Sequence, residues 1–188
     1  MTPVNAPFRI CFVCTGNICR SPMAESVFRS RIAEEGLDGL VEVDSAGTGG
    51  WHEGDGADPR TVAVLRAGGY DHTHTARQFQ ASWFADRDLV IALDSGHLRA
   101  LRRLAPTPED AAKVRLLRSY AADAAPVGEP GLDVPDPYYG GFEGFEECLE
   151  MIEKAGDGLL DAVCDAVTTR TQDTSLSLST APEAKEHA

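Results

Sequence analysis

The 188-residue chain has no long apolar segment and a shortage of basic side chains. No apolar run approaches the ~18 residues that suggest a membrane-spanning helix, and residues 2–7 lack the basic and apolar regions of a signal peptide. Lysine and arginine number 17 against 30 aspartates and glutamates, which gives a formal net charge of -13. This charge argues against general affinity for nucleic acid or anionic lipid. We therefore expect a cytoplasmic protein without a nucleic-acid or membrane partner.

Cysteines are few, and patterns typical of metal sites are missing. Five cysteines, an odd number, do not suggest a disulfide framework. We expect Cys11 to lie in the core and Cys148 and Cys164 to pack within the last helix. No H-x-x-x-H motif or carboxylate cluster points to a metal site, so we expect neither a metal nor another cofactor.

The most informative stretch is residues 14–22, Cys-Thr-Gly-Asn-Ile-Cys-Arg-Ser-Pro, between an apolar run and a helix-compatible run. Gly16 permits a left-handed turn and Asn17 tolerates one. The helix that begins near Ser21 leaves its first N–H groups without partners, so its start attracts anions. Arg20 can add a bidentate fork to a phosphate held there.

The same surroundings favour a reactive Cys14. A thiol beside a helix N-terminus and a cation is readily ionised, and a thiolate under a phosphorus atom is a nucleophile for phosphoryl transfer. Ser21 can donate a hydrogen bond to this sulfur, whereas Asn17 is better suited to bracing the loop. The residues alone leave one alternative open, a buried structural Cys14 followed by a helix-capping Ser21.

Residues 13–22 resemble the active-site signature of low-molecular-weight protein tyrosine phosphatases, in particular the bacterial branch. The resemblance extends from about Phe8 to about Thr169. It implies that Cys14 is the nucleophile and that Arg20 binds phosphate and stabilises the transition state. It also implies that an oxidised Cys14 can be trapped as a disulfide with Cys19. The remaining members of the implied phosphate-binding loop are Thr15, Gly16, Asn17, Ile18, Cys19 and Ser21.

A second motif, residues 132–141, offers a general acid. Prolines flank Asp136 and two tyrosines follow it, and a carboxyl group near aromatic rings can stay protonated at neutral pH. A tyrosyl oxygen leaves poorly unless it is protonated, so the chemistry needs such a group. The residues alone leave Asp133 as a rival acid, and a proline-stiffened surface turn as an alternative. The resemblance to the family's acid loop favours Asp136.

Further site residues rest mainly on the resemblance. Trp51, in a glycine-rich loop, would wall a pocket for a flat aromatic substrate, unless it packs on the scaffold. Tyr138 would line the pocket opposite it and Tyr139 its rim, and either tyrosine is a candidate for a tyrosine kinase. His74 would brace Asn17 from behind. Asp94 would cap the following helix, and the resemblance adds a role in steadying the loop region.

Alternating strands and helices predict an α/β fold, a single domain with three layers, α/β/α, and a four-stranded parallel sheet. The resemblance implies the strand order 2-1-3-4, and the phosphate loop follows strand 1. We expect a flexible leader over residues 1–7, one domain over 8–169 and a disordered tail over 170–188. The expected strands are residues 8–13, 41–46, 88–93 and 113–116, and the expected helices are 21–36, 58–67, 82–85, 96–104 and 142–169, the last broken near Gly156 and Gly158.

The resulting hypothesis is a metal-independent phosphatase acting on phosphotyrosine proteins. Arsenate reductases share the fold and loop but need a resolving cysteine, and none lies between Cys19 and Cys148. Protein-arginine phosphatases, by resemblance, carry a small threonine where this loop has Ile18. A non-catalytic phosphoprotein-binding module would keep Arg20 but has no need of both Cys14 and Asp136.

Overall fold

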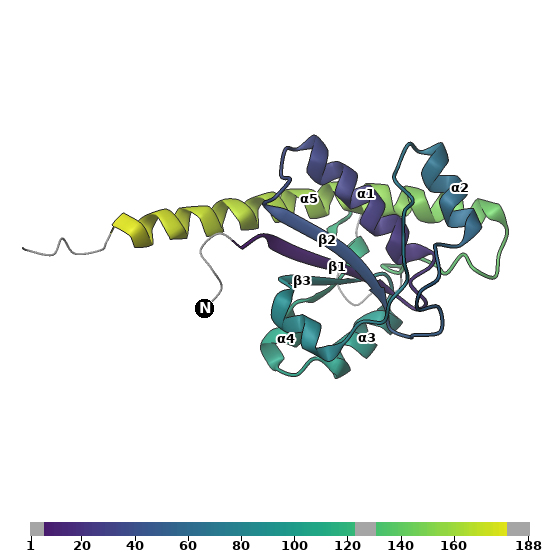
Figure 1. The fold of residues 1–188 in the computed structure, drawn as a ribbon, viewed down its shortest axis with the longest axis horizontal. Coiled ribbons are helices and arrows are strands. Elements are labelled where there is room, and N and C mark those ends of the chain that lie inside the picture. Colours follow the sequence, from purple (N-terminus) through teal and green to yellow (C-terminus); the bar gives the residue numbers. More distant parts are fainter. Residues whose placement is uncertain (1–5, 123–130, 180–188) are drawn as a thin grey trace, which may run out of the picture.

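The computed structural model describes residues 6–122 and 131–179 (Figure 1). Within them strands and helices alternate, as the sequence predicts. The elements in chain order are β1 (Phe8–Cys14), α1 (Arg20–Glu34), β2 (Val41–Gly47), α2 (Pro59–Ala67), η1 (Ala81–Asp86), β3 (Leu89–Ala92), α3 (Ser95–Leu104), α4 (Pro108–Ala112), β4 (Val114–Leu116), η2 (Leu117–Tyr120) and α5 (Phe142–Ser179).

The four strands form one parallel sheet in the order β2-β1-β3-β4, which confirms the expected order. Helices α1, α2 and α5 cover one face, and α3 and α4 lie on the other, so the three-layer arrangement is also confirmed (Figure 1). The central strand β1 pairs with β2 on one side and β3 on the other. The loop after β1 therefore lies at the carboxyl edge where neighbouring connections diverge, the usual ligand site of such sheets.

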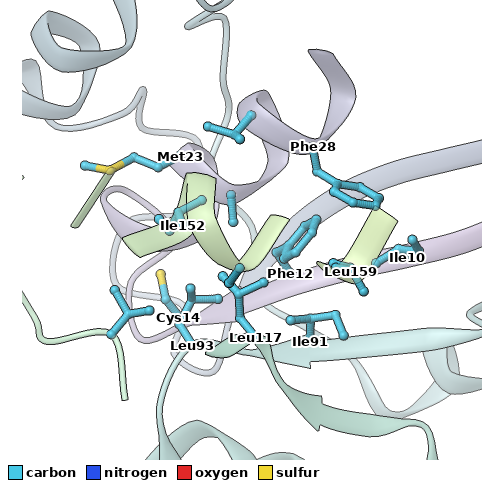
Figure 2. Packing of buried hydrophobic residues seen from close by; sticks show 14 of the residues in the cluster. Ile10, Phe12, Cys14, Met23, Phe28, Ile91, Leu93, Leu117, Ile152 and Leu159 are labelled. Atoms are coloured by element: carbon cyan, nitrogen blue, oxygen red, sulfur yellow. The ribbon is translucent and has the colours of Figure 1, made fainter. Parts of the chain in front are cut away.

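Alternation along β1 decides which face of the sheet receives Cys14. Side chains of a strand point to opposite faces in turn. Ile10, Phe12 and Cys14 belong to the core cluster under α1 and α5, whereas Cys11 and Val13 belong to the cluster on the α3 side. Figure 2 shows Phe12 beside Phe28, with ring centroids 5.7 Å apart, and Cys14 at one end of the same cluster. Burial of alternate apolar side chains on both faces thus fixes the strand that carries Cys14.

The expected break in the last helix is wrong, because α5 runs without interruption through both glycines. A Cβ on Gly158 would lie only 1.8 Å from the carbonyl oxygen of Tyr120 in η2. Gly156 likewise faces Val27 of α1, whose Cγ1 would be 3.9 Å from an added Cβ. The glycine at position 158 serves the close approach of two backbones and does not end the helix.

The expected disorder from Arg170 onward is wrong for residues 170–179, which continue α5. Arg170 donates to Asp88 at 2.6 Å and stacks on the ring of Phe8. The hydroxyl of Thr174 donates to the carbonyl oxygen of Arg170 at 3.0 Å, and Ser175 bonds in the same way one turn back, to Thr171. These bonds give the hydroxyl groups partners within the helix, and the contacts of Arg170 tie this part of α5 to β1 and the start of β3. Residues 1–5 of the expected leader, residues 123–130 and residues 180–188 lie outside the described residues.

Two other elements deserve comparison with the sequence. Helix α2 begins and ends as expected, with the side chain of Asp58 accepting the N–H of Arg60 as an N-cap. Helix α4 was not expected, although Thr107 caps it and Pro108 occupies its first turn. A capping threonine followed by proline is a helix-start signal, so this element could have been found.

Candidate active site

The loop from Cys14 to Arg20 links the end of β1 to the start of α1. Helix α1 begins at Arg20, one residue earlier than predicted, and its N-cap Cys19 forms no side-chain capping bond. The first helical N–H groups are therefore available to a ligand. The loop is aligned from outside by backbone bonds, because Thr48 and Gly49 donate to the carbonyl oxygens of Cys14 and Thr15 at 2.8 and 3.0 Å.

Asn17 forms the buried centre of this loop. It is fully buried and adopts φ 58°, the left-handed conformation that asparagine tolerates. Its side-chain amide donates to the hydroxyl oxygens of Ser21 and Ser45 at 2.8 and 3.0 Å. Its side-chain oxygen accepts the N–H of Arg77 at 3.0 Å. The predicted bracing position of Asn17 agrees with these contacts.

The sulfur of Cys14 lies 2.9 Å from the hydroxyl oxygen of Ser21, and both residues are buried. Because Asn17 donates to this oxygen, the single hydroxyl hydrogen of Ser21 remains available to another acceptor. Its two candidate acceptors are the sulfur of Cys14 and, at 3.3 Å, the carbonyl oxygen of Ala46. The nearer sulfur is the better placed of the two.

The guanidinium of Arg20 is 3% exposed and held by fixed partners. One nitrogen donates to Asp94 at 2.7 Å and to the carbonyl oxygen of Val134 at 3.0 Å. The other lies 3.5 Å from the hydroxyl of Thr15 and 3.5 Å from the carboxylate of Asp136. Burial disfavours the charge, but the sulfur of Cys14 and the neighbouring carboxylates outweigh it and raise the pKa of Arg20. The guanidinium therefore remains a fixed cation beside the sulfur.

Asp136, and not Asp133, reaches the pocket. One carboxylate oxygen of Asp136 faces Arg20, and the other accepts the N–H of Tyr138 at 3.1 Å. The carboxylate of Asp133 instead accepts the N–H and hydroxyl of Ser95 at the start of α3, at 2.8 and 3.1 Å. Of the two aspartates, only Asp136 lines the cavity with Cys14 and Arg20.

That cavity measures about 340 Å³ and lies above the phosphate loop. Trp51 is 75% exposed and Tyr139 90%, so both stand at its rim, while Tyr138 is 40% exposed. The rings of the two tyrosines meet edge to face with centroids 5.0 Å apart. The cavity is lined by Cys14, Thr15, Gly16, Ile18, Cys19, Arg20, Trp51, His52, Asp136, Tyr138 and Tyr139.

Comparison with known proteins agrees with this site. The family model for low molecular weight phosphotyrosine protein phosphatase matches residues 9–169. The chain belongs to this family. A low molecular weight protein-tyrosine-phosphatase of Streptomyces coelicolor is 71% identical over 163 residues, which are 87% of this chain and 98% of the relative.

Solved structures of the family have the same fold. The crystal structure of a protein tyrosine phosphatase from Entamoeba histolytica, with Hepes in its active site, gives a TM-score of 0.79 at 32% identity and covers 85% of this chain and 98% of that chain. The YwlE arginine phosphatase of Bacillus subtilis gives a TM-score of 0.72 at 30% identity over 83% of this chain and 95% of that chain. Among the described residues, no helix is long and apolar enough to cross a membrane.

His74 and Asp94 contact the phosphate loop from behind, His74 at Asn17 and Asp94 at Arg20. The ring nitrogen Nε2 of His74 donates to the carbonyl oxygen of Asn17 at 2.6 Å, and Nδ1 lies 3.7 Å from Glu25. Asp94 both caps α3, through the N–H of His97, and holds Arg20. Burial opposes its charge, but these two donors lower the pKa of Asp94. Asp94 thus contacts both the start of α3 and the arginine of the phosphate loop.

Two other cysteines near the site, Cys19 and Cys148, have thiols with raised pKa values. Burial, followed by the negative charge of Asp58, raises the pKa of Cys19 to about 12. Burial also raises the pKa of Cys148, in α5, to about 12. Both thiols are therefore protonated at neutral pH. A cysteine nucleophile must be a thiolate, so neither is suited to that role.

Several residues around the phosphatase pocket were missed from the sequence. His52 lines the cavity, and its ring lies 3.0 Å from where a Cβ on Gly16 would be. A Cβ on Gly47 would lie 2.7 Å from the carbonyl oxygen of Thr15, so this glycine lets the two loops meet. His97 donates or accepts a hydrogen bond at 2.8 Å with Thr15. The glycine-rich stretch itself was a visible signal for close backbone approach, whereas the histidines carried no distinguishing pattern.

Proposed function

We propose that this protein hydrolyses phosphotyrosine monoesters in proteins through a phosphocysteine intermediate. The observation that carries the proposal is the convergence of three groups on one cavity. The sulfur of Cys14, the guanidinium of Arg20 and the carboxyl group of Asp136 line the same pocket of about 340 Å³. The aromatic side chains of Tyr138 and, at the rim, Trp51 border the cavity, as suits a flat aromatic substrate.

In the first step the thiolate of Cys14 attacks phosphorus. The S–P bond forms as the bond from phosphorus to the tyrosyl oxygen breaks, and Asp136 gives its proton to that oxygen. Charge on the transferring phosphoryl group is met by Arg20 and by the N–H groups of the loop and helix start. Asp94 holds Arg20 at 2.7 Å and so keeps the fork oriented before substrate arrives.

In the second step a water molecule attacks the phosphocysteine. Asp136 takes the proton from this water, the P–S bond breaks, and inorganic phosphate leaves. The sulfur of Cys14 departs as a thiolate, and a hydrogen bond from Ser21, 2.9 Å away, stabilises its charge. Arg20 stabilises both steps because the same phosphoryl oxygens face it throughout.

Depth favours an aryl ester over a shorter phosphorylated side chain. Cys14 is 3% exposed at the base of a cavity whose rim carries Trp51 and Tyr139. Ile18 also lines the cavity and adds apolar surface beside the ring. In arginine phosphatases the family resemblance implies a threonine in place of Ile18. The smaller, polar threonine side chain would widen the cavity and make this part of its lining polar. These observations support phosphotyrosine as the substrate class over phosphoarginine.

Two finer proposals concern partners and compartment. Tyr139 is 90% exposed, so a tyrosine kinase could reach it without unfolding the loop, and phosphorylation there would change the charge at the rim. The five free cysteines fit a reducing compartment, and we propose that the protein acts in the cytoplasm.

We also propose redox control at Cys14. A sulfenic acid on this sulfur would condense with the thiol of Cys19, forming an S–S bond and releasing water. Both sulfurs are buried in the same core cluster. Mass spectrometry after peroxide treatment, with a Cys19→Ala control, would detect the disulfide. Loss of activity without a Cys14–Cys19 disulfide would refute this form of control.

Turnover of defined substrates tests the main proposal. We expect hydrolysis of a phosphotyrosyl peptide to exceed that of matched phosphoseryl and phosphoarginyl peptides, and to persist in excess chelator. The Cys14→Ser variant should lose turnover by at least about 10⁴-fold while remaining folded. A fully active Cys14→Ser variant would end the proposed mechanism, and preference for phosphoarginine would replace the substrate class.

A further inference from the structure

Arg60, in the first turn of α2, is an arginine that the chemistry above does not use. Its side chain is 34% exposed, yet its guanidinium and backbone have partners in two different loops. One partner, Asp58, is hydrogen-bonded to the phosphate loop. The other partners, Tyr138 and Gly140, belong to the loop that carries Asp136. This placement raises the question of what a fixed cation does between them.

On one side Arg60 is anchored to Asp58. The two carboxylate oxygens of Asp58 accept Nε and a terminal nitrogen of the guanidinium, both at 3.0 Å. The side chain of Asp58 is 8% exposed, and hydrogen bonds from Arg60 lower its pKa, so this carboxylate is charged. The N–H of Asp58 donates to the carbonyl oxygen of Ile18 at 2.9 Å. Arg60 is therefore tied, through one residue, to the phosphate loop.

On the other side Arg60 holds the backbone after Asp136. Its remaining terminal nitrogen donates to the carbonyl oxygens of Tyr138 and Gly140 at 3.1 and 3.4 Å. The guanidinium also lies over the rings of Phe145 and Tyr138, 4.4 and 5.5 Å from their centroids. Stacking on rings and donation in the guanidinium plane use different faces of the group, so they can operate together.

The link to the general acid passes through a single residue. Tyr138 accepts from Arg60 at its carbonyl oxygen and donates its N–H to Asp136 Oδ1 at 3.1 Å. Oδ2 of Asp136 is thereby left facing the cavity, 3.5 Å from Arg20. If the residues after Asp136 moved away, its carboxyl group would lose the N–H that fixes its rotation.

We propose that Arg60 is a positioning residue that sets the distance between the general acid and the phosphate loop. The inference rests on the proposed function, because it assigns a role to the loop that carries Asp136. A lysine could not replace it, since three guanidinium nitrogens and the ring-stacking face are all engaged. Binding of the phosphate group itself does not depend on Arg60 in this account.

Leaving-group dependence separates positioning of an acid from general damage. A phosphotyrosyl peptide has a poor leaving group and needs the proton, whereas p-nitrophenyl phosphate has a good one and needs it less. We expect Arg60→Met to lower kcat/KM for the peptide by about 10- to 50-fold and for p-nitrophenyl phosphate by less than about 3-fold. Arg60→Lys should resemble Arg60→Met. The control is Arg66→Met on the same helix, whose guanidinium contacts His72 on the exposed surface and which should match the wild type.

Two further measurements distinguish an effect of Arg60 through Asp136 from an effect on phosphate binding. In an Asp136→Asn background, Arg60→Met should cause no further selective loss, because the acid it positions is already absent. Inhibition by inorganic phosphate should stay within about 2-fold of wild type in Arg60→Met. Equal losses on both substrates, full additivity with Asp136→Asn, or a large change in phosphate inhibition would each overturn the proposal.

Amide hydrogen exchange tests the positioning role of Arg60 separately from the proposed function. We expect faster exchange in the Arg60→Met variant over residues 138–141, with exchange of β1 unchanged. A wild-type protein that hydrolyses neither substrate would refute the proposed function, and the role of Arg60 in catalysis with it. If the wild type is active but exchange and leaving-group dependence are both unaltered in Arg60→Met, only the positioning role is refuted.

Discussion

The phosphate loop and the loop around Asp136 face each other across one cavity but are held in different ways. The phosphate loop is braced from behind by buried side chains, with Asn17 fully buried. The acid loop exposes 42% of the Asp136 side chain and is held by arginines at its two ends. Arg118 donates to the carbonyl oxygens of Gly131 and Asp133, and Arg60 donates to carbonyl oxygens beyond Asp136.

This difference matches the roles that we propose for the two loops. A phosphoryl group needs donors that are already in place, and a buried, fully bonded loop supplies them without reorganisation. A general acid must serve a leaving group and then a water molecule, which requires solvent nearby. Clamping the backbone at both ends while leaving the carboxyl group exposed meets both needs. Changes in the two loops should therefore differ in kind, not only in size.

Among changes that compare the two loops and leave the nucleophile in place, the largest effect should come from Arg20→Lys. Lysine keeps the charge but cannot form the fork or bond Asp94 and Val134 together. We expect kcat/KM to fall by about 10³-fold for every aryl phosphate, irrespective of leaving group. Steady-state kinetics with a series of substituted phenyl phosphates measures this. A loss confined to poor leaving groups would contradict the assignment of Arg20 to the phosphoryl group.

Asp136→Asn should give a smaller loss that depends on the leaving group. Without a proton donor, kcat/KM for a phosphotyrosyl peptide should fall by about 10²-fold, and much less for p-nitrophenyl phosphate. The matched control is Asp133→Asn, because the carboxylate of Asp133 is occupied by Ser95 of α3. Equal behaviour of the two variants would reopen the choice of acid. The same substrate series serves both measurements.

Asn17 tests the buried brace of the phosphate loop. Asn17→Ala would leave the N–H of Arg77 without its acceptor and force alanine into a positive φ. We expect a loss of about 3 kcal/mol in the free energy of unfolding, with activity falling in parallel. Asn17→Gly should recover about 1 kcal/mol of this, because glycine accepts the backbone conformation. Urea denaturation of the pair measures the difference, and identical stabilities would show that the backbone conformation costs nothing.

The same contrast explains which parts of the site could be predicted from the sequence. The phosphate loop is contiguous, so its residue order specifies strand, turn and helix start, and β1 ends and α1 begins within one residue of the predicted bounds. The acid loop resembles a known motif, but its anchors lie outside that motif, Arg60 78 residues before Tyr138 and Arg118 13 residues before Gly131. No local pattern marks an arginine as the partner of a distant carbonyl oxygen. His52 was missed for the same reason.

Errors along the chain have a similar origin. Gly158 was expected to interrupt α5 because isolated propensity disfavours glycine in helices. The carbonyl oxygen of Tyr120, 38 residues away in the sequence, is what requires it. Composition also predicted disorder over residues 170–179, where the long-range contacts of Arg170 with Asp88 and Phe8 tie the helix to the domain. Contacts that form only in the folded chain decided both cases.

The smallest effect at neutral pH concerns His97, which links the phosphate loop to the start of α3. Its Nε2 contacts the hydroxyl of Thr15, and its Nδ1 is buried without a hydrogen-bond partner, 3.2 Å from Asp94. Burial lowers the pKa of His97 from its ordinary value of 6.5 to about 4. The folded protein therefore keeps this ring neutral where an unfolded chain would protonate it.

The sign of the pH dependence follows from that difference. Above pH 6.5 both states hold a neutral ring, so the contribution to stability is complete. As the pH falls from 6.5 toward 4, the unfolded chain binds the proton first, and the free energy of unfolding decreases by on the order of 3 kcal/mol. A His97→Asn variant lacks this titration but keeps Asp94, so the stability difference between the two proteins isolates it. Chemical denaturation at several pH values should show the wild type losing its advantage between pH 6.5 and 4. A constant difference would mean that His97 is already protonated or remains solvated, and that the ring does not act as a neutral link between Thr15 and α3.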